Sequence, residues 1–498
     1  MMRENGVMFW VLTGVSLLVF MILQSRVSVP GDMAWLSLAA ESFLSGRSMT
    51  DAFMDNNPPL SYMIYLPVAI IVRAGIPLWT AGFLYGAALL LCSTFLIARL
   101  LKFFLVPGQL FYYAVIWAWL LSVTVFWQAE FANKDHLIAL MLLPFLLAQY
   151  AITCGAKKSA VVRMALILCT PFILLKPHYG LLCVLILGHR FWKEGRISII
   201  FDFDFMCLAI GTILYAAITL VWFPDFLAYV LPTVSLGMYV TLVLNDVLIS
   251  FAGMGLFSVC LIIMMWFADG DKRSRDFTLF LGFMMLASTI PFVSQLKGFS
   301  LHMIPFISLA IPAVFLTALL YLKATQSDRR LHVVLLAGFL VLLSAGLMRA
   351  LAASTHEDYR DSPLAAYISR HAEGSSFLMQ SLSTNIVVPL SVYTGIPHAT
   401  RFTSFWFLNL LDSQDNVSFF ADLVAEDLER FQPAMVALYH DPAPEDDMLK
   451  LFAGSERFAE VWGHYYKSDE IAVDSYEFYK RKGVQHEGYP VYDVYLRK

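Results

Sequence analysis

Long apolar stretches recur along the first 350 residues of the chain and limit what it can fold into. A helix of about 20 apolar residues is long enough to cross a bilayer, and a helix satisfies its own backbone hydrogen bonds there. Stretches of this length, or close to it, lie at 7–23, 79–98, 109–127, 137–153, 205–223, 246–267, 277–294, 303–322 and 331–348. Charged residues make up 14% of the chain, whereas soluble domains carry about 25%. The sequence therefore predicts a multi-pass α-helical membrane protein.

Basic residues between these stretches indicate which side of the membrane each loop faces, because Lys and Arg are enriched in cytoplasmic loops. They gather at 99–102, 157–163, 190–196, 272–275 and 323–330. The segments expected on the outer side are then 24–60, 127–136, 224–245, 295–302 and everything after about 349. The pattern predicts a cytoplasmic N-terminus and a C-terminus outside the cytoplasm.

Two segments complicate the number of spans. Residues 160–192 are basic at both ends and have a polar break at Lys176–Gly180, which predicts two short helices that meet near the outer surface. Residues 60–77 hold a short apolar run with Pro67 inside it, and runs of about 10–14 residues are typical of interfacial or re-entrant segments. We therefore expect about eleven spans. Since no small-residue cleavage site follows Leu23, the first helix is expected to remain uncleaved.

The composition changes after Arg349, where charged residues become frequent and apolar runs become short. Alternating patterns predict strands within 375–382, 434–440 and 491–498, and a helix within 421–431. Residues 385–395 are typical of a helix or of a passage from strand to helix. The chain is thus predicted to consist of a transmembrane domain, 1–349, and a water-soluble α/β domain, 350–498, outside the membrane.

The sequence lacks the patterns of common metal and nucleotide sites. The six cysteines all precede residue 261 and lie in or beside apolar runs, so neither a disulfide framework nor a thiolate metal site is expected. HExxH, paired CxxC and P-loop motifs are absent from the sequence. We predict no metal site, no certain cofactor and no nucleic-acid partner, although nothing in the sequence decides whether a divalent cation is needed.

The segments expected outside carry clusters of polar residues. The first contains Asp32, nine residues after the first apolar stretch, and then Asp55 and Asn57 before Pro58-Pro59. A carboxylate at a membrane boundary is costly unless it is used or solvated. Such a loop is equally consistent with a solvated connection, so the cluster alone does not establish a site.

Three further clusters are short and lie between apolar stretches. Their polar residues include Glu130, Lys134 and Asp135 in the second, Lys176 and His178 in the third, and Lys297 and His302 in the fourth. Each has a structural alternative: a helix cap for the second, a lysine that reaches the interface for the third, and an interfacial anchor for the fourth. The stronger indication of a site is that all four clusters are expected on the outer side of the membrane. The loops expected on the inner side are simply basic.

The first outer loop resembles the first external loop of GT-C glycosyltransferases, and most of all those of the aminoarabinose transferases of lipid A and the protein O-mannosyltransferases. The matching residues are Asp32, Ala34, Trp35, Ala39, Leu44, Gly46, Pro58-Pro59-Leu60 and Tyr62. Met33 stands where the family often has a second acid, and Asn57 where a lysine precedes the prolines. The resemblance covers residues 7–200 in pattern and the remainder only in architecture.

The resemblance implies an inverting glycosyltransferase of the bacterial inner membrane, with its C-terminal domain in the periplasm. It would move a sugar from polyprenyl phosphate to a glycan, lipid or protein acceptor of the cell envelope. Asp32 is the expected base, and Asp135 or Glu130 the second catalytic acid. The loop with Asp55 and Asn57 is expected to contact the acceptor. The expected contacts of the donor phosphate are Lys176, Lys134, His178, Lys297 and His302.

Two alternatives come from other functional classes. A transporter or a flippase of lipid-linked glycans would be expected to have related halves and charges near the middle of its spans, and the sequence has neither. A scaffold that binds glycans without catalysis would give the acids around Asp32 and Asp135 no role.

Overall fold

The computed structural model describes most of the chain. The described residues are 13–15, 17–18, 20–22, 24, 29–55, 57–105, 110–124, 130–231, 244–267, 272–294, 300–324, 362–381, 384–402, 404–405, 414–440, 447–472 and 491–498. The predicted span at 331–348, the predicted domain boundary near residue 349 and Lys297 therefore lie outside the described residues.

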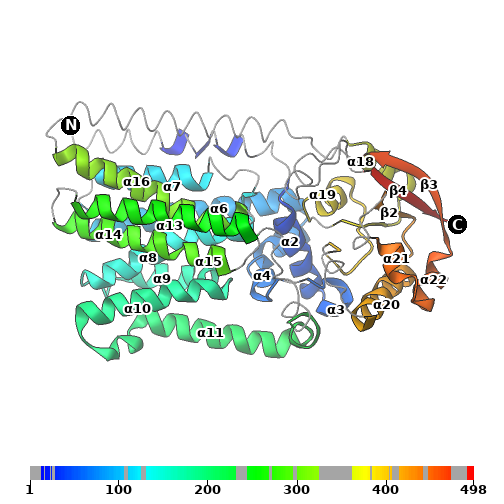
Figure 1. The fold of residues 1–498 in the computed structure, drawn as a ribbon, viewed down its shortest axis with the longest axis horizontal. Helices are drawn as coiled ribbons and strands as arrows, with labels where there is room; N and C mark the ends of the chain where they lie inside the picture. The colour runs from blue at the N-terminus through cyan, green and yellow to red at the C-terminus, as the bar shows by residue number, and fades with distance from the viewer. Residues whose placement is uncertain are drawn as a thin grey trace. The chain divides into compact units, whose positions relative to one another are not determined.

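The chain divides into two compact units, which are described separately (Figure 1). The first unit consists of Met1–Val27, Phe83–Ile218 and Val240–Thr355. The second consists of Ser28–Gly82, Thr219–Tyr239 and His356–Lys498.

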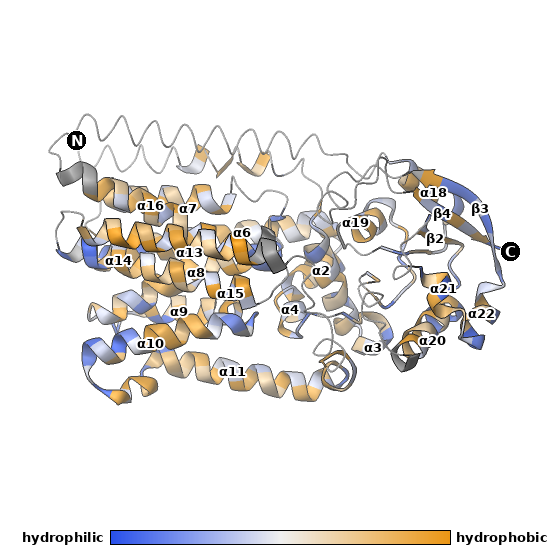
Figure 2. Cartoon of the chain, viewed as in Figure 1, coloured by the Kyte–Doolittle hydropathy of each residue, from blue (hydrophilic) through white to orange (hydrophobic). Residues whose placement is uncertain are grey.

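The first unit is a bundle of apolar helices, which Figure 2 shows mostly in orange. Its elements are α6 (Leu78–Leu100), η1 (Leu101–Phe103), α7 (Leu110–Thr124), α8 (Lys134–Thr153), α9 (Ala160–Ile173), η3 (Pro177–Tyr179), α10 (Gly180–Glu194), η4 (Ile197–Phe201), α11 (Phe203–Trp222), α13 (Leu244–Phe267), α14 (Lys272–Ala287), α15 (Thr289–Ser294), η6 (Ser300–Met303) and α16 (Ile304–Ala324).

Five helical segments of the described chain are long and apolar enough to cross a membrane: Leu78–Phe103, Lys134–Thr153, Phe203–Trp222, Leu248–Phe267 and Ser274–Ser294. Shorter apolar helices lie at Thr13–Ile22, Phe111–Thr124, Ala160–Ile173 and Ile304–Leu320. The chain is thus a multi-pass membrane protein. The count of about eleven spans stays a prediction.

Helix α8 is the centre of the first unit, because 94% of its apolar window is buried. It packs against α9, α16 and α7. The Ser93 hydroxyl of α6 donates a hydrogen bond to the carbonyl of Leu140, which fixes α6 against it. By contrast, only 11% of the corresponding window of α11 is buried, as expected of a helix whose apolar surface faces lipid.

Ion pairs join the start of α9, the end of α10 and the start of α11. The Arg190 guanidinium, which is fully buried, donates to Glu194, Asp202 and Asp204. Lys157, from the loop before α9, lies 2.9 Å from Glu194 and 3.1 Å from Asp202. Two of the basic loops predicted to face the cytoplasm therefore meet at one end of the bundle.

The second unit begins with helices from the first outer loop and the segment that follows it. These are α2 (Gly31–Leu44), α3 (Met49–Ala52), α4 (Leu60–Met63) and α5 (Leu66–Arg73). At about 1.5 Å per residue, the eight residues of α5 extend far less than the thickness of a bilayer, so it is no span by itself.

The rest of this unit is a four-stranded sheet with helices around it. Its elements are η5 (Phe226–Val230), α18 (Pro363–His371), β1 (Phe377–Met379), α19 (Thr384–Thr394), α20 (Gln414–Phe431), β2 (Met435–Tyr439), α21 (Met448–Phe452), α22 (Glu456–Trp462), β3 (Tyr465–Ala472) and β4 (Val491–Arg497). The strand order is β1-β2-β4-β3. Strand β1 runs parallel to β2, and the other neighbours are antiparallel.

The first outer loop packs directly on the C-terminal part of the chain. Helix α2 packs on α19, and the Tyr393 hydroxyl accepts a hydrogen bond of 2.8 Å from the Val29 amide. The guanidinium groups of Arg401 and Arg430 donate to the carbonyls of Thr50 and Asp51 at 2.8 and 2.9 Å. Segments bonded in this way lie on the same side of a membrane, as the loop charges predict for these two.

Residues just after α11 belong to the same unit. The Phe43 and Phe223 rings stack with centroids 4.9 Å apart, and the Thr50 hydroxyl donates to the Asp225 carboxylate at 2.8 Å. A third segment predicted to be external therefore joins the first two.

Acid is expected to destabilise this unit through His398. The Met379 amide donates to His398 Nε2 at 3.1 Å, and burial lowers the pKa of the imidazole to about 4. The pKa of this histidine in the unfolded chain is about 6.5. At pH values between 6.5 and 4, the imidazole is therefore protonated in the unfolded chain but not in the folded chain. The stabilising contribution is therefore complete above pH 6.5 and is lost as the pH falls toward 4, by about 3 kcal/mol at most.

Thermal unfolding of the full chain between pH 7.5 and 4 measures this effect, with His398→Gln as the comparison. The glutamine carbonyl is able to accept the Met379 amide but does not titrate. Wild type should lose more stability than the variant over this range, and identical pH slopes would contradict the assignment to His398.

Candidate functional site

Three of the predicted site residues meet in the first unit: Asp135, Lys176 and His302. The Lys176 ammonium donates to Asp135 Oδ1 at 2.6 Å and lies 3.0 Å from His302 Nδ1. His302 Nδ1 is 3.5 Å from Asp135 Oδ2. The residues come from α8, the turn before η3, and η6, so three segments predicted on the same side of the membrane contribute one each.

The start of α8 positions Asp135. Asn133 is the N-cap, and its side chain accepts a hydrogen bond of 3.2 Å from the Asp135 amide, as expected of asparagine at this position. The preceding residue, Ala132, has a φ of +63°. Such a conformation costs a non-glycine residue about 1–3 kcal/mol and persists only where the surrounding contacts compensate for it.

His136 holds this strained turn in place. Its Nδ1 accepts from the Ala132 amide at 3.3 Å, and its Nε2 lies 2.6 Å from the Val123 carbonyl. A nitrogen that accepts and one that donates define a neutral imidazole with its proton on Nε2. His136 thus has a structural role and fixes the turn from which Asp135 projects.

The polar break predicted at 176–180 is present and supplies Lys176. Helix α9 ends at Ile173, the 3₁₀ turn η3 covers Pro177–Tyr179, and α10 begins at Gly180. Because the helix is interrupted here, the lysine side chain leaves the helical path and reaches Asp135 on α8.

The exposure of the three side chains is uneven. Asp135 is 1% exposed, His302 7% and Lys176 12%. A buried ion pair recovers the loss of hydration only when its geometry is good. Asp135 Oδ2 is buried and lies 3.5 Å from His302 Nδ1. The most exposed group of the cluster, and so the one best able to contact a ligand, is therefore the Lys176 ammonium.

The other predicted site residues of the first unit are Glu130, Lys134, His178 and Lys297. Glu130 Oε2 accepts from the Asn133 side-chain amide at 2.9 Å, so it braces the cap that holds Asp135. Lys134 is the first residue of α8 and half-buried, and His178 is half-buried in η3. Lys297 lies outside the described residues, so its predicted role is open.

Asp32 belongs to the second unit, where it is half-buried in the first turn of α2. A negative charge at a helix N-terminus is favoured by the helix dipole. Asp135 belongs to the first unit, so these two predicted catalytic acids lie in different compact units.

Asp55 and Asn57, predicted to contact the acceptor, form a hydrogen-bonded network with Trp35 of α2. Asp55 is almost fully buried and accepts from Trp35 Nε1 at 3.1 Å and from the Asn57 side chain at 2.5 Å. The Tyr62 hydroxyl donates to the Asn57 carbonyl at 3.0 Å. These contacts tie the loop before Pro58 to α2 and so help to position the helix that carries Asp32.

A second buried ion pair, between Arg401 and Asp427, was not predicted from the sequence. Arg401 Nε donates to Asp427 Oδ1 at 2.9 Å, and Oδ2 accepts from Thr400 and from the Arg401 amide. Burial raises the pKa of Asp427. A guanidinium held in this way is well placed to bind the Thr50 carbonyl of the first outer loop.

One group of side chains in the second unit has the composition of a metal site. Ligand atoms of His440, Glu470 and Asp493 lie within 4.8 Å of one another. The Lys467 ammonium, however, lies 2.6 Å from Glu470 and 3.0 Å from Asp493. It already supplies a cation to the two carboxylates, and we interpret the group as an exposed ion network.

Comparisons with known proteins give little beyond the chain itself. No protein-family model matches it, and no curated protein matches it. Among solved structures it is similar to the cryo-EM structure of a mutant of arabinofuranosyltransferase AftD from Mycobacteria, with 15% identity and a TM-score of 0.41. The match covers 97% of this chain and 41% of that one, so the chain spans less than half of the length of AftD. A similarity at this level supports no conclusion on fold or function.

Proposed function

We propose that the chain is a membrane glycosyltransferase of the GT-C type. It would move a sugar from a polyprenyl-phosphate donor to an acceptor of the cell envelope, on the outer face of the membrane and with inversion at the sugar carbon. The observation that carries the proposal is the cluster of Asp135, Lys176 and His302 at one end of an apolar bundle. Such a cluster suits a ligand that is apolar at one end and anionic at the other.

Lys176 and His302 are proposed to bind the donor phosphate. The ammonium is the most exposed group of the cluster, and a cation gains most where negative charge develops during the reaction. In glycosyl transfer this is the phosphate oxygen that leaves the sugar. Asp135, which already binds Lys176, would hold the ammonium in position for it.

Asp32 is proposed to act as the base. The acceptor oxygen would attack the anomeric carbon while the bond from that carbon to the phosphate oxygen breaks, and the hydroxyl proton would pass to the carboxylate. One attack on the face opposite the leaving phosphate inverts the sugar carbon. A positioned carboxylate is suited to this task, and α2 is fixed in place by the hydrogen bonds around Asp55.

A transporter is the weaker interpretation on one specific ground. In the five described membrane-length segments, charged residues occur only in or near the first or last turns, as with Asp135 in α8 and Asp204 in α11. A substrate pathway through the membrane would place such groups near the middle.

The C-terminus is expected to lie outside the cytoplasm. The loops at 99–102, 157–163 and 190–196 are basic, so the positive-inside rule predicts that they face the cytoplasm and that the other ends of the helices they join face outward. The first outer loop, predicted to face outward, is hydrogen-bonded to the C-terminal part of the chain. Alkaline phosphatase fused after Lys498 should be active and a cytoplasmic fluorescent reporter should not. The reverse result would exclude transfer on the outer face.

Mass spectrometry of cell-envelope glycans tests the proposed function directly. Cells that lack the protein should lose one sugar substituent, and the wild-type chain should restore it. Purified protein should then transfer that sugar from a synthetic polyprenyl-phosphate donor. An unchanged glycan profile, together with no turnover of any such donor, would contradict the proposal.

A further inference from the structure

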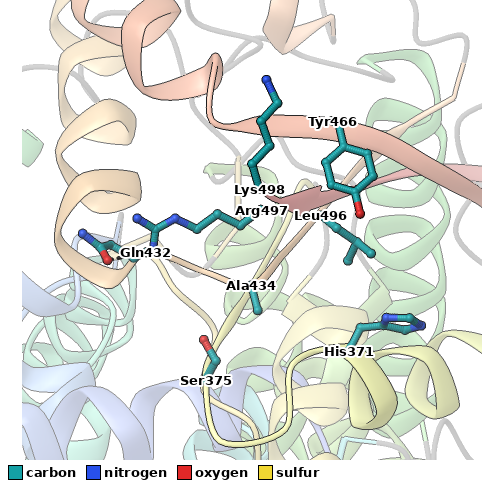
Figure 3. Close-up of a pocket in the computed structure, with 8 residues that line it drawn as sticks. All are labelled: His371, Ser375, Gln432, Ala434, Tyr466, Leu496, Arg497 and Lys498. Atoms are coloured by element: carbon teal, nitrogen blue, oxygen red, sulfur yellow. Dashed lines mark hydrogen bonds between the residues drawn. The ribbon is translucent and has the colours of Figure 1, made fainter.

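A pocket of about 320 Å³ opens on the second unit at the end of its sheet (Figure 3). Its volume lies at the lower end of the range for small-molecule sites, about 300–1,000 Å³. The end of β4 and the start of β3 form one side, and the segments after α18 and α20 form the rest. None of the residues of the Asp135 cluster lines it.

The lining of the pocket is basic. It includes Arg497 and Lys498, and none of the described residues that line it is acidic. A guanidinium stays charged at every physiological pH and binds carboxylates and phosphates through two parallel hydrogen bonds. The pocket therefore favours an anion.

Hydrogen bonds hold the basic groups in defined positions. Arg497 Nη1 donates to Gln432 Oε1 at 2.7 Å, as the dashed line in Figure 3 shows. Gln432 has a φ of +46° where the chain leaves α20. The Lys498 ammonium donates to the Gly463 carbonyl at 2.8 Å. Because one guanidinium nitrogen is anchored, Arg497 can present its other donors to a ligand with little loss of side-chain entropy.

The rest of the lining suits a ligand that is rich in hydroxyl groups. Tyr466 is 47% exposed, and Figure 3 shows its ring across the pocket from the Arg497 side chain. Ser375 and Gln432 add a hydroxyl and an amide, and Ala434 and Leu496 add a small apolar surface. Sugars combine these features, because their rings have apolar C–H faces and their edges carry hydroxyls.

We propose that this pocket binds an acidic saccharide, a sugar that carries a carboxylate. Arg497 binds the carboxylate, the Tyr466 ring packs on the sugar face, and the polar side chains contact its hydroxyls. The binding does not depend on sugar transfer, so it can be tested whether or not the proposed function holds.

The experiment is calorimetric titration of the purified full chain with a glucuronate-containing disaccharide and with its neutral glucose counterpart. We expect the acidic disaccharide to bind at least ten-fold more tightly and its affinity to fall as salt is added, since salt screens exposed charges. Equal binding of the two would exclude the carboxylate contact. Inorganic phosphate that binds as tightly as the disaccharide would exclude the saccharide part of the proposal.

Variants locate the binding. Arg497→Gln and Tyr466→Leu should each weaken it at least ten-fold, and Arg497→Lys should retain part of it. The matched control is Arg457→Gln, an exposed arginine of the same unit that is paired with Glu429 outside the pocket. Unfolding temperatures within a few degrees of wild type would show that the fold is intact. Binding by a folded Arg497→Gln variant at wild-type affinity would overturn the proposal.

Discussion

Asp32→Asn is expected to abolish sugar transfer while the protein remains folded and inserted in the membrane. The side chain is half-buried in the first turn of α2, and the amide has nearly the same shape as the carboxylate but cannot take up the proton of an acceptor hydroxyl. Loss of a general base typically lowers turnover by about 10²–10⁴.

The matched control is Asp51→Asn, the same change on an exposed residue of the same loop. It should keep wild-type turnover, because its exposed side chain accepts a hydrogen bond from the nearby Ser48 hydroxyl, a contact that the amide oxygen of asparagine can keep. Turnover of purified protein with a synthetic polyprenyl-phosphate sugar measures both variants. If Asp32→Asn retains more than a tenth of the wild-type rate, another group is the base.

Lys176→Ala should lower turnover by about 10²–10³, the usual cost of removing one preorganised electrostatic group. Since the ammonium would act on the departing phosphate more than on the bound donor, kcat should fall more than the apparent donor affinity. Lys176→Arg keeps the charge and should retain part of the activity.

The structure adds a complication, because Lys176→Ala leaves the Asp135 carboxylate buried without its ammonium partner. Breaking a buried pair in this way costs about 3–5 kcal/mol of stability. The double variant Lys176→Ala/Asp135→Asn removes both charges and separates the two effects. If Lys176 binds phosphate, the double variant should regain stability but not turnover. If it regains turnover as well, Lys176 serves only as a counter-ion.

The sequence predicted the local structure around Asp135 and Lys176 but not the contacts among Asp135, Lys176 and His302. Asn133 and Asp135 are helix-start residues, and α8 begins between them at Lys134, three residues earlier than the apolar pattern alone indicates. The break at Lys176–Gly180 was predicted from polarity and is present. That both segments also approach His302 depends on how α8, η3 and η6 pack, and side-chain packing between distant segments leaves no periodic trace in a single sequence.

Strand β3 and the hydrogen bonds of Asp55 were not predicted from the sequence. Strand β3 has four consecutive exposed polar residues, at 467–470, so it lacks the alternation that identifies a half-buried strand. The hydrogen bonds that the Asp55 carboxylate accepts from Trp35 and Asn57 were not predicted, and its contact with an acceptor stays a prediction. Trp35, three residues after Asp32, was the available signal, because a buried indole N–H needs an acceptor.

The joining of residues 28–82 with residues 356–498 in one compact unit has a consequence for biogenesis. The early segment leaves the ribosome about 270 residues before the partner on which it packs, a delay of roughly 15–60 s at about 5–20 residues per second. During that time α2 has no α19 to contact, and Thr50 and Asp51 have no arginines. The packing of α2, which carries Asp32, on α19 is therefore complete only after Thr384–Thr394 has been synthesised. A nascent or truncated chain that ends before α19 cannot form this contact.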